Sequence, residues 1–456
     1  MQKMKLINIA YTGAQAAQAK LNTTAMNTAN AYTPGYSRQR VEVSALGGYG
    51  MSAGSGVEVT GIRRISDQYL TNQVWRANSE TGYFTMGQQY IGALEQIIGA
   101  ESTGLGYGLD KFFASLNSAT TTPENRALRE QVINEANAMA TRFNSVNNFI
   151  NTQKDNITTQ RNSTLESINS LTSNIAEFNR HISELEAKGH NVNTLRDERD
   201  ELVNELSGLV DVRVNETSDG SYTVSLVDGQ PLVSGRNSST LKMGTDSNGA
   251  PAMELTFSGT TFGVDMSTGG QLGALHDYEV GTLGEMQATV TSMAKLIADT
   301  FNDQLAQGFD LNGNPGKPLF VFDPNNPRGM LQVNDISAEE LAFSDTAGED
   351  GNGKNLQALI GIKNQTMAID GLGNMSLNEA SAAIVSRVGI ASRQNQVELR
   401  AASAVQFEAI SQRDSVSGVS MDEEAVNLLT YTKAYQSNLK VMATGDQIFS
   451  DLLALF

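Results

Sequence analysis

Histidine, a side chain often used for metal binding and proton transfer, occurs at only three positions, His181, His190 and His276. The first two lie near the end of an expected helix, and no carboxylate pattern around them completes a set of metal ligands. The chain has no cysteine, which excludes disulfides, thiolate catalysis and cysteine-ligated metals. We therefore interpret the three histidines as solvated side chains and predict no metal site.

Two other segments resemble ligand-binding loops only in part. Residues 310–314 begin like a calcium-binding EF-hand loop, but Pro315 stands where that loop needs Gly and Val321 where it needs Glu. Residues 104–108, Gly-Leu-Gly-Tyr-Gly, lack the G-x-G-x-x-G spacing and a surrounding βαβ unit, so we expect a flexible loop there. The His-Glu-x-x-His and P-loop patterns are absent. The sequence therefore predicts no cofactor and no enzymatic activity.

The composition restricts the partners of the chain. Its formal net charge is −18, which argues against nucleic-acid binding because contact with a phosphate backbone needs a basic surface. No apolar run approaches the ~20 residues of a membrane-spanning helix, so we expect no membrane insertion. Asn8, Tyr11 and Thr12 interrupt the N-terminal apolar stretch, which argues against a cleaved signal peptide. The length of 456 residues predicts more than one domain.

The strongest structural pattern is a long helix at the C-terminal end, residues 421–456. Ser420 and Glu423 form a predicted capping box, and Asp422 to Glu424 place negative charge at the positive end of the helix dipole. Apolar residues then recur at alternating steps of three and four, as in a coiled-coil seam. The seam positions are Ala425, Leu428, Thr432, Tyr435, Leu439, Met442, Asp446, Phe449, Leu453 and Phe456. One amphipathic helix cannot bury such a seam alone, so we expect the other end of the chain to be its partner.

The N-terminal segment has the properties of that partner. Residues 4–30 predict a helix rich in small side chains, which lets another helix approach closely. Residues 1–40 contain five basic side chains and no acid, whereas residues 421–456 contain five acids against Lys433 and Lys440. The opposite charges favour pairing between the two ends or between neighbouring copies. The predicted assembly interface comprises Leu6, Ala10, Gly13, Ala17, Leu21, Leu428, Tyr435, Leu439, Met442, Phe449, Leu453 and Phe456.

A turn follows the N-terminal helix. Thr33-Pro34-Gly35-Tyr36 fits a type II turn, because Pro restricts φ at the second position and Gly supplies a positive φ at the third. The whole segment NTANAYTPGYSRQ resembles the N-terminal signature of the axial proteins of the bacterial flagellum, which are the rod, hook and first hook-associated proteins. The motif residues are Asn27, Asn30, Thr33, Pro34, Gly35, Tyr36, Ser37 and Arg38.

Long helices are expected over most of the remaining chain. They span residues 66–99, 123–188, 195–209, 285–307 and 376–414. Thr122, before Pro123, is one predicted N-terminal cap, and Thr194 with Asp197 is another. A polar stretch at 158–164 predicts that the second of these helices frays or bends there.

Strands are expected in two places. Short strands at 41–43 and 57–59 alternate apolar and polar residues across a Gly-rich loop. From Val210 the apolar period changes from that of a helix to two, and Asp219-Gly220 and Asp228-Gly229 are turn signals. Residues 211–270 therefore predict a small β domain inserted between helices.

Three segments make the resemblance specific. LRDERDELVNELSGLVDVRV, FFASLNSATTTPENRALREQVINEANAMATRFN and FNDQLAQGFDLNGNPGKPLF resemble sequences of the flagellar hook-associated protein 1 family. The resemblance implies a mainly α fold with paired terminal coiled-coil helices, a long helical middle domain and a small outer β domain. We expect residues 1–33 with 417–456 to form the terminal-helix domain, 34–210 with 271–416 the middle domain with its short β-hairpin, and 211–270 the outer domain.

The resemblance also implies a function. The chain would be a structural subunit of the flagellum that self-assembles through its terminal helices into the junction between hook and filament. It implies an extracellular location, type III export without a cleaved signal peptide, and contacts with hook protein, the second junction protein and an export chaperone at the C-terminal region. The alternatives are another axial protein of hook or rod type, and a secreted adhesin or coiled-coil binding module. A need for intact terminal helices would separate the axial proteins from an adhesin.

Overall fold

The computed structural model describes residues 2–47, 54–100, 104–245, 251–326 and 328–454. Within these ranges the chain is mainly α-helical, with strands inserted between helices, as predicted. It forms two compact units: unit 1 is Met1–Thr81, Leu165–Gly270 and Ala402–Phe456, and unit 2 is Gly82–Thr164 and Gln271–Ala401. These units differ from the three-domain division expected from the sequence, which stays a proposal about the assembled protein.

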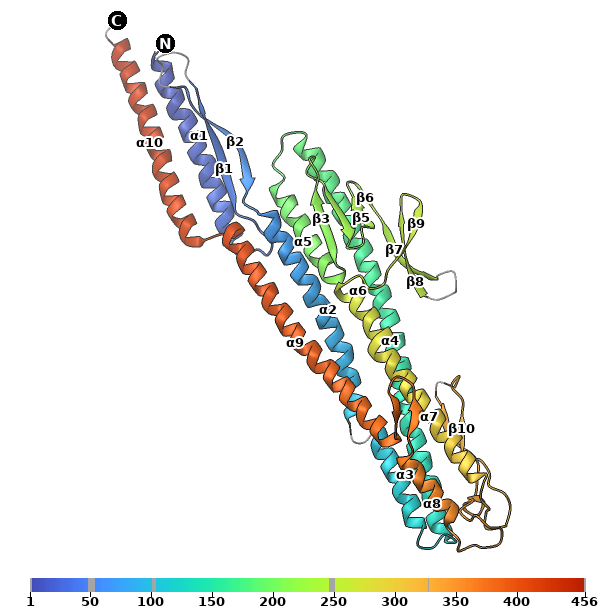
Figure 1. Cartoon of the computed structure of the whole chain (residues 1–456). Coiled ribbons are helices and arrows are strands. Elements are labelled where there is room, and N and C mark those ends of the chain that lie inside the picture. Colours follow the sequence, from blue (N-terminus) through green and yellow to red (C-terminus); the bar gives the residue numbers. More distant parts are fainter. Residues whose placement is uncertain (1, 48–53, 101–103, 246–250, 327, 455–456) are drawn as a thin grey trace. The chain divides into compact units, whose positions relative to one another are not determined.

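Unit 1 contains both ends of the chain. Figure 1 shows α1 (Gln2–Ala29) and α10 (Met421–Leu453) side by side, with the two chain ends at the same end of the pair. The strands β1 (Gln39–Leu46) and β2 (Gly56–Arg64) form an antiparallel hairpin beside α1. The terminal helix pair predicted from the sequence is thereby confirmed.

The strands predicted within 211–270 form two antiparallel sheets in unit 1. The first sheet has the order β3 (Val212–Glu216), β4 (Tyr222–Leu226), β5 (Pro231–Ser234) and β6 (Asn237–Ser238). The second has the order β7 (Thr240–Thr245), β8 (Pro251–Phe257) and β9 (Thr260–Val264). Gly220 and Gly229 have φ angles of 76° and 92°, as the two predicted Asp-Gly turns require. Asn179 of α4 (Arg126–Glu186) attaches the first sheet to this helix, because its Nδ2 donates to the carbonyls of Tyr222 and Gly235 at 2.8 and 2.7 Å.

Unit 2 is built around a cluster of aromatic side chains. Phe112 and Phe113 on α3 (Leu105–Ala119), Phe301 on α7 (Gly284–Leu305) and Phe320 on β10 (Phe320–Phe322) are almost fully buried. Neighbouring ring centroids in this cluster are 5.1 to 5.9 Å apart, in the range of favourable aromatic contacts. The remaining elements are parts of α2 (Gln68–Gly99), α4 and α9 (Leu377–Ser417), α6 (Gly270–Asp277), a π-helical turn (Tyr278–Leu283), β11 (Leu331–Val333), α8 (Lys354–Gly361), β12 (Met367–Ile369), β13 (Gly373–Met375) and two 3-10 turns (Ala338–Glu340 and Ile362–Asn364).

The prediction of a flexible loop at residues 104–108 is wrong. α3 begins at Leu105, and Gly108 is buried in the first turns of this helix. A Cβ atom at Gly108 would lie 2.7 Å from Arg142 Cδ, so the glycine permits close packing of α3 on α4. Leu105 and Leu109 are also buried. Burial of this apolar face outweighs the ~1 kcal/mol that each glycine costs in a helix.

The bend expected at 158–164 is also absent. α4 continues through these residues without interruption. Arg161 is buried and forms an ion pair with Glu279, and Thr164 is buried as well. Polar residues in this stretch therefore have partners inside unit 2, which the sequence pattern does not reveal.

The helix caps predicted at Thr122 and at Thr194 differ from the observed ones. α4 begins after Asn125, whose Oδ1 accepts the N–H of Ala127 at 2.9 Å, and not after Thr122. α5 (Asn193–Leu209) includes Thr194 in its first turn. The Asp197 side chain is buried against other elements, and so it is not available to a capping box.

Candidate assembly site at the chain termini

The two terminal helices approach closely because glycine lies at the contact. A Cβ atom at Gly13 of α1 would lie 2.6 Å from Asn438 Oδ1, and one at Gly445 of α10 would lie 2.8 Å from Ile7 Cγ1. Ala10 is 1% exposed at the same contact region of α1. A Cβ atom at either glycine would force the facing side chain of Asn438 or Ile7 to move, so the two glycines permit the observed close contact.

The contacts along α10 recur every seven residues, as in a coiled coil. The contacting positions are Glu424, Tyr431, Asn438 and Gly445. Lys20 Nζ of α1 lies 5.4 Å from the centre of the Tyr431 ring, a favourable cation–π arrangement. The stripe of α10 that faces α1 is therefore mostly polar or small, and it is not the stripe that the sequence pattern favours.

The predicted apolar seam is displaced from this stripe, by one residue at Leu439 and by four residues at Leu428, Tyr435, Met442 and Phe449. Leu428, Leu439 and Phe449 are 48%, 42% and 51% exposed, whereas Tyr435 and Met442 are half-buried. A shift of one residue rotates a helix position by about 100°, and a shift of four residues rotates it by about 40°. α1 therefore covers only one edge of the apolar stripe, and most of this stripe stays in contact with solvent.

The other predicted interface residues also include both buried and exposed side chains. Ala10 and Ala17 are buried, Gly13 contacts Asn438, Leu21 is half-buried and Leu6 is exposed. The side chain of Leu453 and the whole of Phe456 lie outside the described residues. The participation of these positions in contacts between copies stays a prediction.

Asn27 is the centre of the N-terminal motif. Its Oδ1 accepts the Gln39 N–H at 2.9 Å and the Tyr36 hydroxyl at 2.9 Å. Its Nδ2 donates to the Gln39 carbonyl at 3.0 Å and to Glu424 Oε1 at 3.2 Å. One buried amide thus links α1, the turn, β1 and the first turn of α10.

The turn predicted at Thr33 to Tyr36 is present. The Tyr36 N–H donates to the Thr33 carbonyl at 3.2 Å, and Gly35 has a φ of 76°. Asn30 ends the helix through its Nδ2, which donates to the Met26 carbonyl at 2.9 Å. Pro34 is exposed. These residues shape the chain reversal, while the contacts to other elements come from their neighbours.

Arg38 joins the motif to α10. Its backbone N–H donates to the Ser417 carbonyl at 2.8 Å, and its guanidinium pairs with Glu423 at 2.5 Å. The Glu423 N–H donates to Ser420 Oγ at 3.4 Å, which is half of the predicted capping box. The Glu423 carboxylate binds Arg38 and does not return to the cap. The expected charge pairing between the two ends is therefore observed at this position.

A buried ionic cluster next to the motif was not predicted from the sequence. Arg64, at the end of β2, pairs with Asp197 at 3.0 Å and with Asp200 at 2.6 Å, and all three side chains are largely buried. Asp197 also accepts the Ser37 N–H at 3.1 Å, and Asp200 accepts the Tyr222 hydroxyl at 2.6 Å. The spacing of the two aspartates on α5 places them on one helix face, but it does not identify Arg64 as their partner.

The cluster continues into the core of unit 1. Arg199 is fully buried, with its guanidinium carbon 3.4 Å from the centre of the Tyr222 ring. It donates to Asn179 Oδ1 at 2.9 Å and to the Gly220 carbonyl at 2.7 Å. Trp75, the only tryptophan of the chain, lies edge-on to Tyr222 with centroids 6.2 Å apart. These contacts hold α5 against β4, and the contact between Trp75 and Tyr222 joins β4 to α2.

The side chain of Tyr36 should make the free energy of unfolding depend on pH. Burial raises the pKa of Tyr36 to about 12, and the nearby carboxylates of Asp197 and Glu424 act in the same direction. Between pH 10 and 12 the folded chain therefore keeps a proton that the unfolded chain has lost, so the free energy of unfolding should decrease as the pH rises through this window. Tyr36→Phe should reduce this decrease in urea unfolding at a series of pH values. A decrease of the same size in the variant would contradict this assignment.

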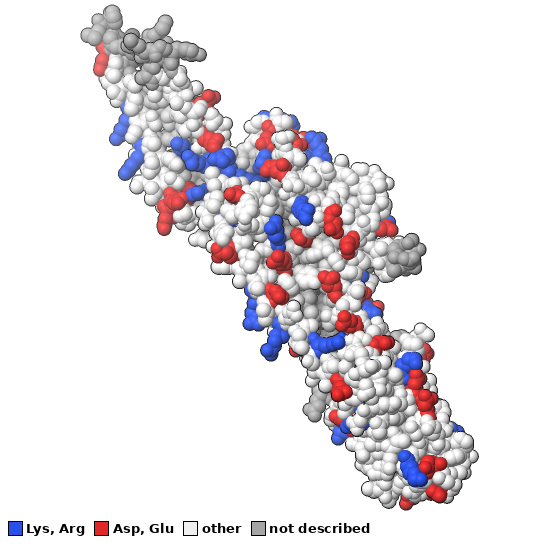
Figure 2. All heavy atoms as spheres, viewed as in Figure 1, with Lys and Arg blue, Asp and Glu red and all other residues white. Residues whose placement is uncertain are grey.

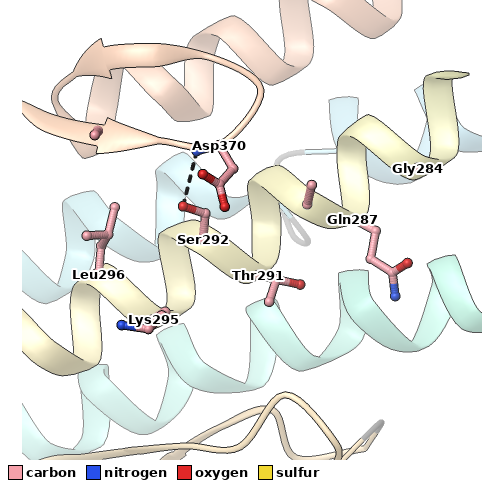
Figure 3. A pocket seen from close by; sticks show the side chains of 9 residues that line it. Gly284, Gln287, Thr291, Ser292, Lys295, Leu296 and Asp370 are labelled. Atoms are coloured by element: carbon pink, nitrogen blue, oxygen red, sulfur yellow. Dashed lines mark hydrogen bonds between the residues drawn. The ribbon is translucent and has the colours of Figure 1, made fainter.

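Figure 3 shows a depression on α7 whose lining includes a serine, a lysine and an aspartate. It encloses about 540 Å³ and is lined by Ser292, Lys295 and Asp370 among others. Ser292 Oγ accepts the N–H of Asp370 at 3.2 Å. Lys295 is paired with Asp299 at 2.5 Å, which raises the pKa of the Lys295 ammonium. A protonated lysine cannot serve as a base for the serine.

The residues considered earlier for metal binding have other roles. His181 lies 3.8 Å from Glu177 on an exposed face of α4. Asp310 Oδ1 accepts the N–H groups of Asn312 and Asn314 at 2.8 and 2.7 Å, which makes it a turn-forming residue. Within the described ranges, no group of three His, Cys, Asp or Glu side chains is placed to hold a metal ion. The helices in the described part of the chain include none that is long and apolar enough to cross a membrane.

Comparison with known proteins identifies the family. Residues 91–320 match the model of the flagellar hook-associated protein FlgK helical domain, and residues 410–455 match that of the flagellar basal body rod FlgEFG protein C-terminal region. The chain is 25% identical to flagellar hook-associated protein 1 of Salmonella typhimurium and of Escherichia coli, over 98% of this chain and 99% of each relative. It is 24% identical to the Bacillus subtilis protein of the same name, over 96% of this chain and 95% of the relative.

A solved structure supports the fold. The flagellar hook junction protein FlgK from Burkholderia pseudomallei superposes with a TM-score of 0.67 at 17% identity, and the match covers 76% of this chain and 100% of that one. The helical-domain match covers half of the present chain, and the relatives align over nearly their whole length. The chain therefore belongs to the flagellar hook-associated protein 1 family, whose members are structural components of the bacterial flagellum.

Proposed function

We propose that this protein joins hook and filament in the external flagellum, and that its copies assemble through their terminal helices. The observation that carries the proposal is the uncovered part of the α10 seam, where Leu428, Leu439 and Phe449 remain 42–51% exposed. A row of exposed apolar side chains marks an interaction surface in a water-soluble chain. The name of the relative from Burkholderia pseudomallei, a hook junction protein, supports this place in the flagellum.

The energy of the seam explains why assembly would need many copies. Complete burial of a leucine or phenylalanine side chain contributes about 1.5–3 kcal/mol, so covering the exposed half of one such residue contributes roughly 1 kcal/mol. One pair of helices gains too little to offset the loss of translational freedom. In a closed or helical assembly each copy contacts more than one neighbour, so several such contacts together hold it in place.

The expected domains fit this role. Residues 1–33 with 417–456 would form an inner tube, 34–210 with 271–416 a surrounding layer, and 211–270 the outermost part. The match of residues 410–455 to the rod protein C-terminal region supports a terminal helix that several axial proteins share. The buried contacts of Asn27 and Arg64, with the exposed ion pair between Arg38 and Glu423, would hold the helix pair at the edge of the surrounding layer.

The partners follow from the proposed position. Hook protein and the second junction protein would flank the assembly, and an export chaperone would cover the C-terminal region before type III export without a cleaved signal peptide. The exposed apolar seam of α10 supports the chaperone proposal, because such a surface needs protection before assembly. The structural role of the family supports a protein without catalytic activity.

Leu439→Asp tests the proposal. The change places a carboxylate in the seam, and a charged group buried without a partner costs several kcal/mol. Leu439 is 42% exposed in one copy, so the fold of the single subunit should change little. We expect flagella without a completed junction, with the variant and filament protein released into the medium.

Lys440→Asp is the matched control. Lys440 is exposed and lies one residue further along α10, on a stripe that faces neither α1 nor the seam. This variant should assemble normally. Equal junction formation by wild type and Leu439→Asp, measured by electron microscopy of isolated flagella, would refute assembly through this seam.

A further inference from the structure

A polar groove lies where α1, the β1–β2 hairpin and the start of α10 meet in unit 1. It encloses about 700 Å³, and its lining includes Lys20, Arg38, Arg40, Val43 and Glu424. Figure 2 shows Lys and Arg side chains gathered in this part of the surface. A concave site of this volume with converging charges is typical of binding sites and exceeds what water alone needs.

Two cations of the groove are available to a partner. Arg38 and Arg63 are each ion-paired with a glutamate of the same copy. Lys20 and Arg40 form no ion pair with any residue that the structure describes, and Lys20 only overlies the Tyr431 ring. The occupant that suits the groove therefore carries carboxylates.

The groove also has an apolar side and one unused acceptor. Val41 and Val43 lie on one face of β1, and Val41 is buried whereas Val43 is 40% exposed. Glu424 is 3% exposed, and its Oε2 has no hydrogen-bond donor among the described residues. A buried oxygen without a donor costs about 1–3 kcal/mol. An occupant with an apolar side chain and an N–H or O–H donor beside its carboxylates would fit all three features.

The last part of α10 has this composition. Residues 446–451 are Asp-Gln-Ile-Phe-Ser-Asp, and no Lys or Arg occurs between 441 and 453. Asp446 and Phe449 are exposed and lie three residues apart on one side of the helix. This segment cannot reach the groove of its own copy, because Asp446 is 22 residues beyond Glu424 on a straight helix, roughly 33 Å away.

We propose that the groove binds residues 446–451 of α10 from a second copy, with Asp446 at Lys20 and Arg40 and Phe449 on the exposed part of the Val43 side chain. The proposal rests on the proposed function, since it assigns the partner surface for the exposed seam of α10. Each copy would then offer one groove and one acidic helix end, an arrangement that forms rings or helices of copies.

Cysteine cross-linking tests the contact directly, because the chain has no cysteine of its own. In flagella that contain Arg40→Cys with Asp446→Cys, mild oxidation should give a ladder of covalently linked copies. The control is Arg40→Cys with Thr444→Cys, since Thr444 is exposed at the same height on the opposite side of α10. No ladder from the first pair, or equal ladders from both pairs, would overturn the proposal.

Exchanging the charges of Arg40 and Asp446 tests the pairing independently. Arg40→Glu and Asp446→Arg should each reduce the number of completed junctions at least tenfold, and the double variant should restore most of them. Normal assembly of both single variants, or no recovery in the double variant, would overturn the pairing.

If Leu439→Asp fails to assemble while the single charge variants assemble, assembly through the seam is supported and the groove contact is refuted. If Leu439→Asp assembles as well, the proposed function itself fails.

Discussion

Arg64→Met is expected to lower the free energy of unfolding of unit 1 by about 3–5 kcal/mol, because removing one partner of a buried ion pair leaves an uncompensated charge. Arg64 is the cation that both Asp197 and Asp200 contact, at 3.0 and 2.6 Å. Methionine preserves much of the side-chain volume and removes only the charge and the donors. Urea unfolding followed by the fluorescence of Trp75 measures the loss, since this buried residue is the only tryptophan and belongs to unit 1.

The neighbouring arginine is the matched control for this change. Arg63 pairs with Glu42 at 2.7 Å, but its side chain is 65% exposed. Exposed ion pairs contribute about 0–1 kcal/mol, so Arg63→Met should alter unfolding little. Similar losses for the two variants would show that the buried cluster contributes no more than a surface pair.

Asn27→Ala is expected to cost at least about 3 kcal/mol, because it leaves the Gln39 N–H, the Gln39 carbonyl and the Glu424 carboxylate without their partner. Each buried group that loses its hydrogen bond costs about 1–3 kcal/mol. These bonds, at 2.9 to 3.2 Å, connect α1 to β1 and α10. The two terminal helices should therefore separate more often from the rest of unit 1, and trypsin should cleave at the exposed Lys433 at least tenfold faster than in the wild type.

Asn30→Ala removes the same side chain from the same motif without breaking contacts between elements. Asn30 Nδ2 donates to the Met26 carbonyl of its own helix at 2.9 Å, and Asn30 Oδ1 accepts the Thr33 hydroxyl of the adjoining turn at 3.3 Å. Its loss should cost less than about 1 kcal/mol and leave the cleavage rate near that of the wild type. Equal cleavage of the two variants would refute the central role of Asn27.

The periodic features of the fold could be predicted from the sequence. The steps of three and four from Ala425 onward indicate α10 and its apolar stripe, because side chains at these steps share one helix face. Alternation after Val210 and two Asp-Gly turns predict strands, as observed in β3 and β4. Signals of this kind are local, since they depend on residues within one or two turns of each other.

Helix ends and short irregular segments were predicted less well. Gly104 to Gly108 contains the residues of a loop, yet α3 includes most of it because Leu105 and Leu109 are buried in unit 2. Arg161 and Thr164 would weaken a solvated helix, but α4 buries both of them. In each case burial against a distant segment outweighs a local preference of about 1 kcal/mol.

The sequence by itself determined the terminal helices, the turn at Thr33 to Tyr36 and the family that these patterns resemble. Only the tertiary structure decided the partners of the motif. Asn27 bonds to Glu424 at the other end of the chain, and Arg64 pairs with Asp197, far beyond any helical or strand period. Polar partners at such separations are selected by which elements pack together and by the need to satisfy every buried polar group. The spacing of apolar residues also located the apolar stripe of α10. Packing against α1 decided which edge of this stripe stays exposed.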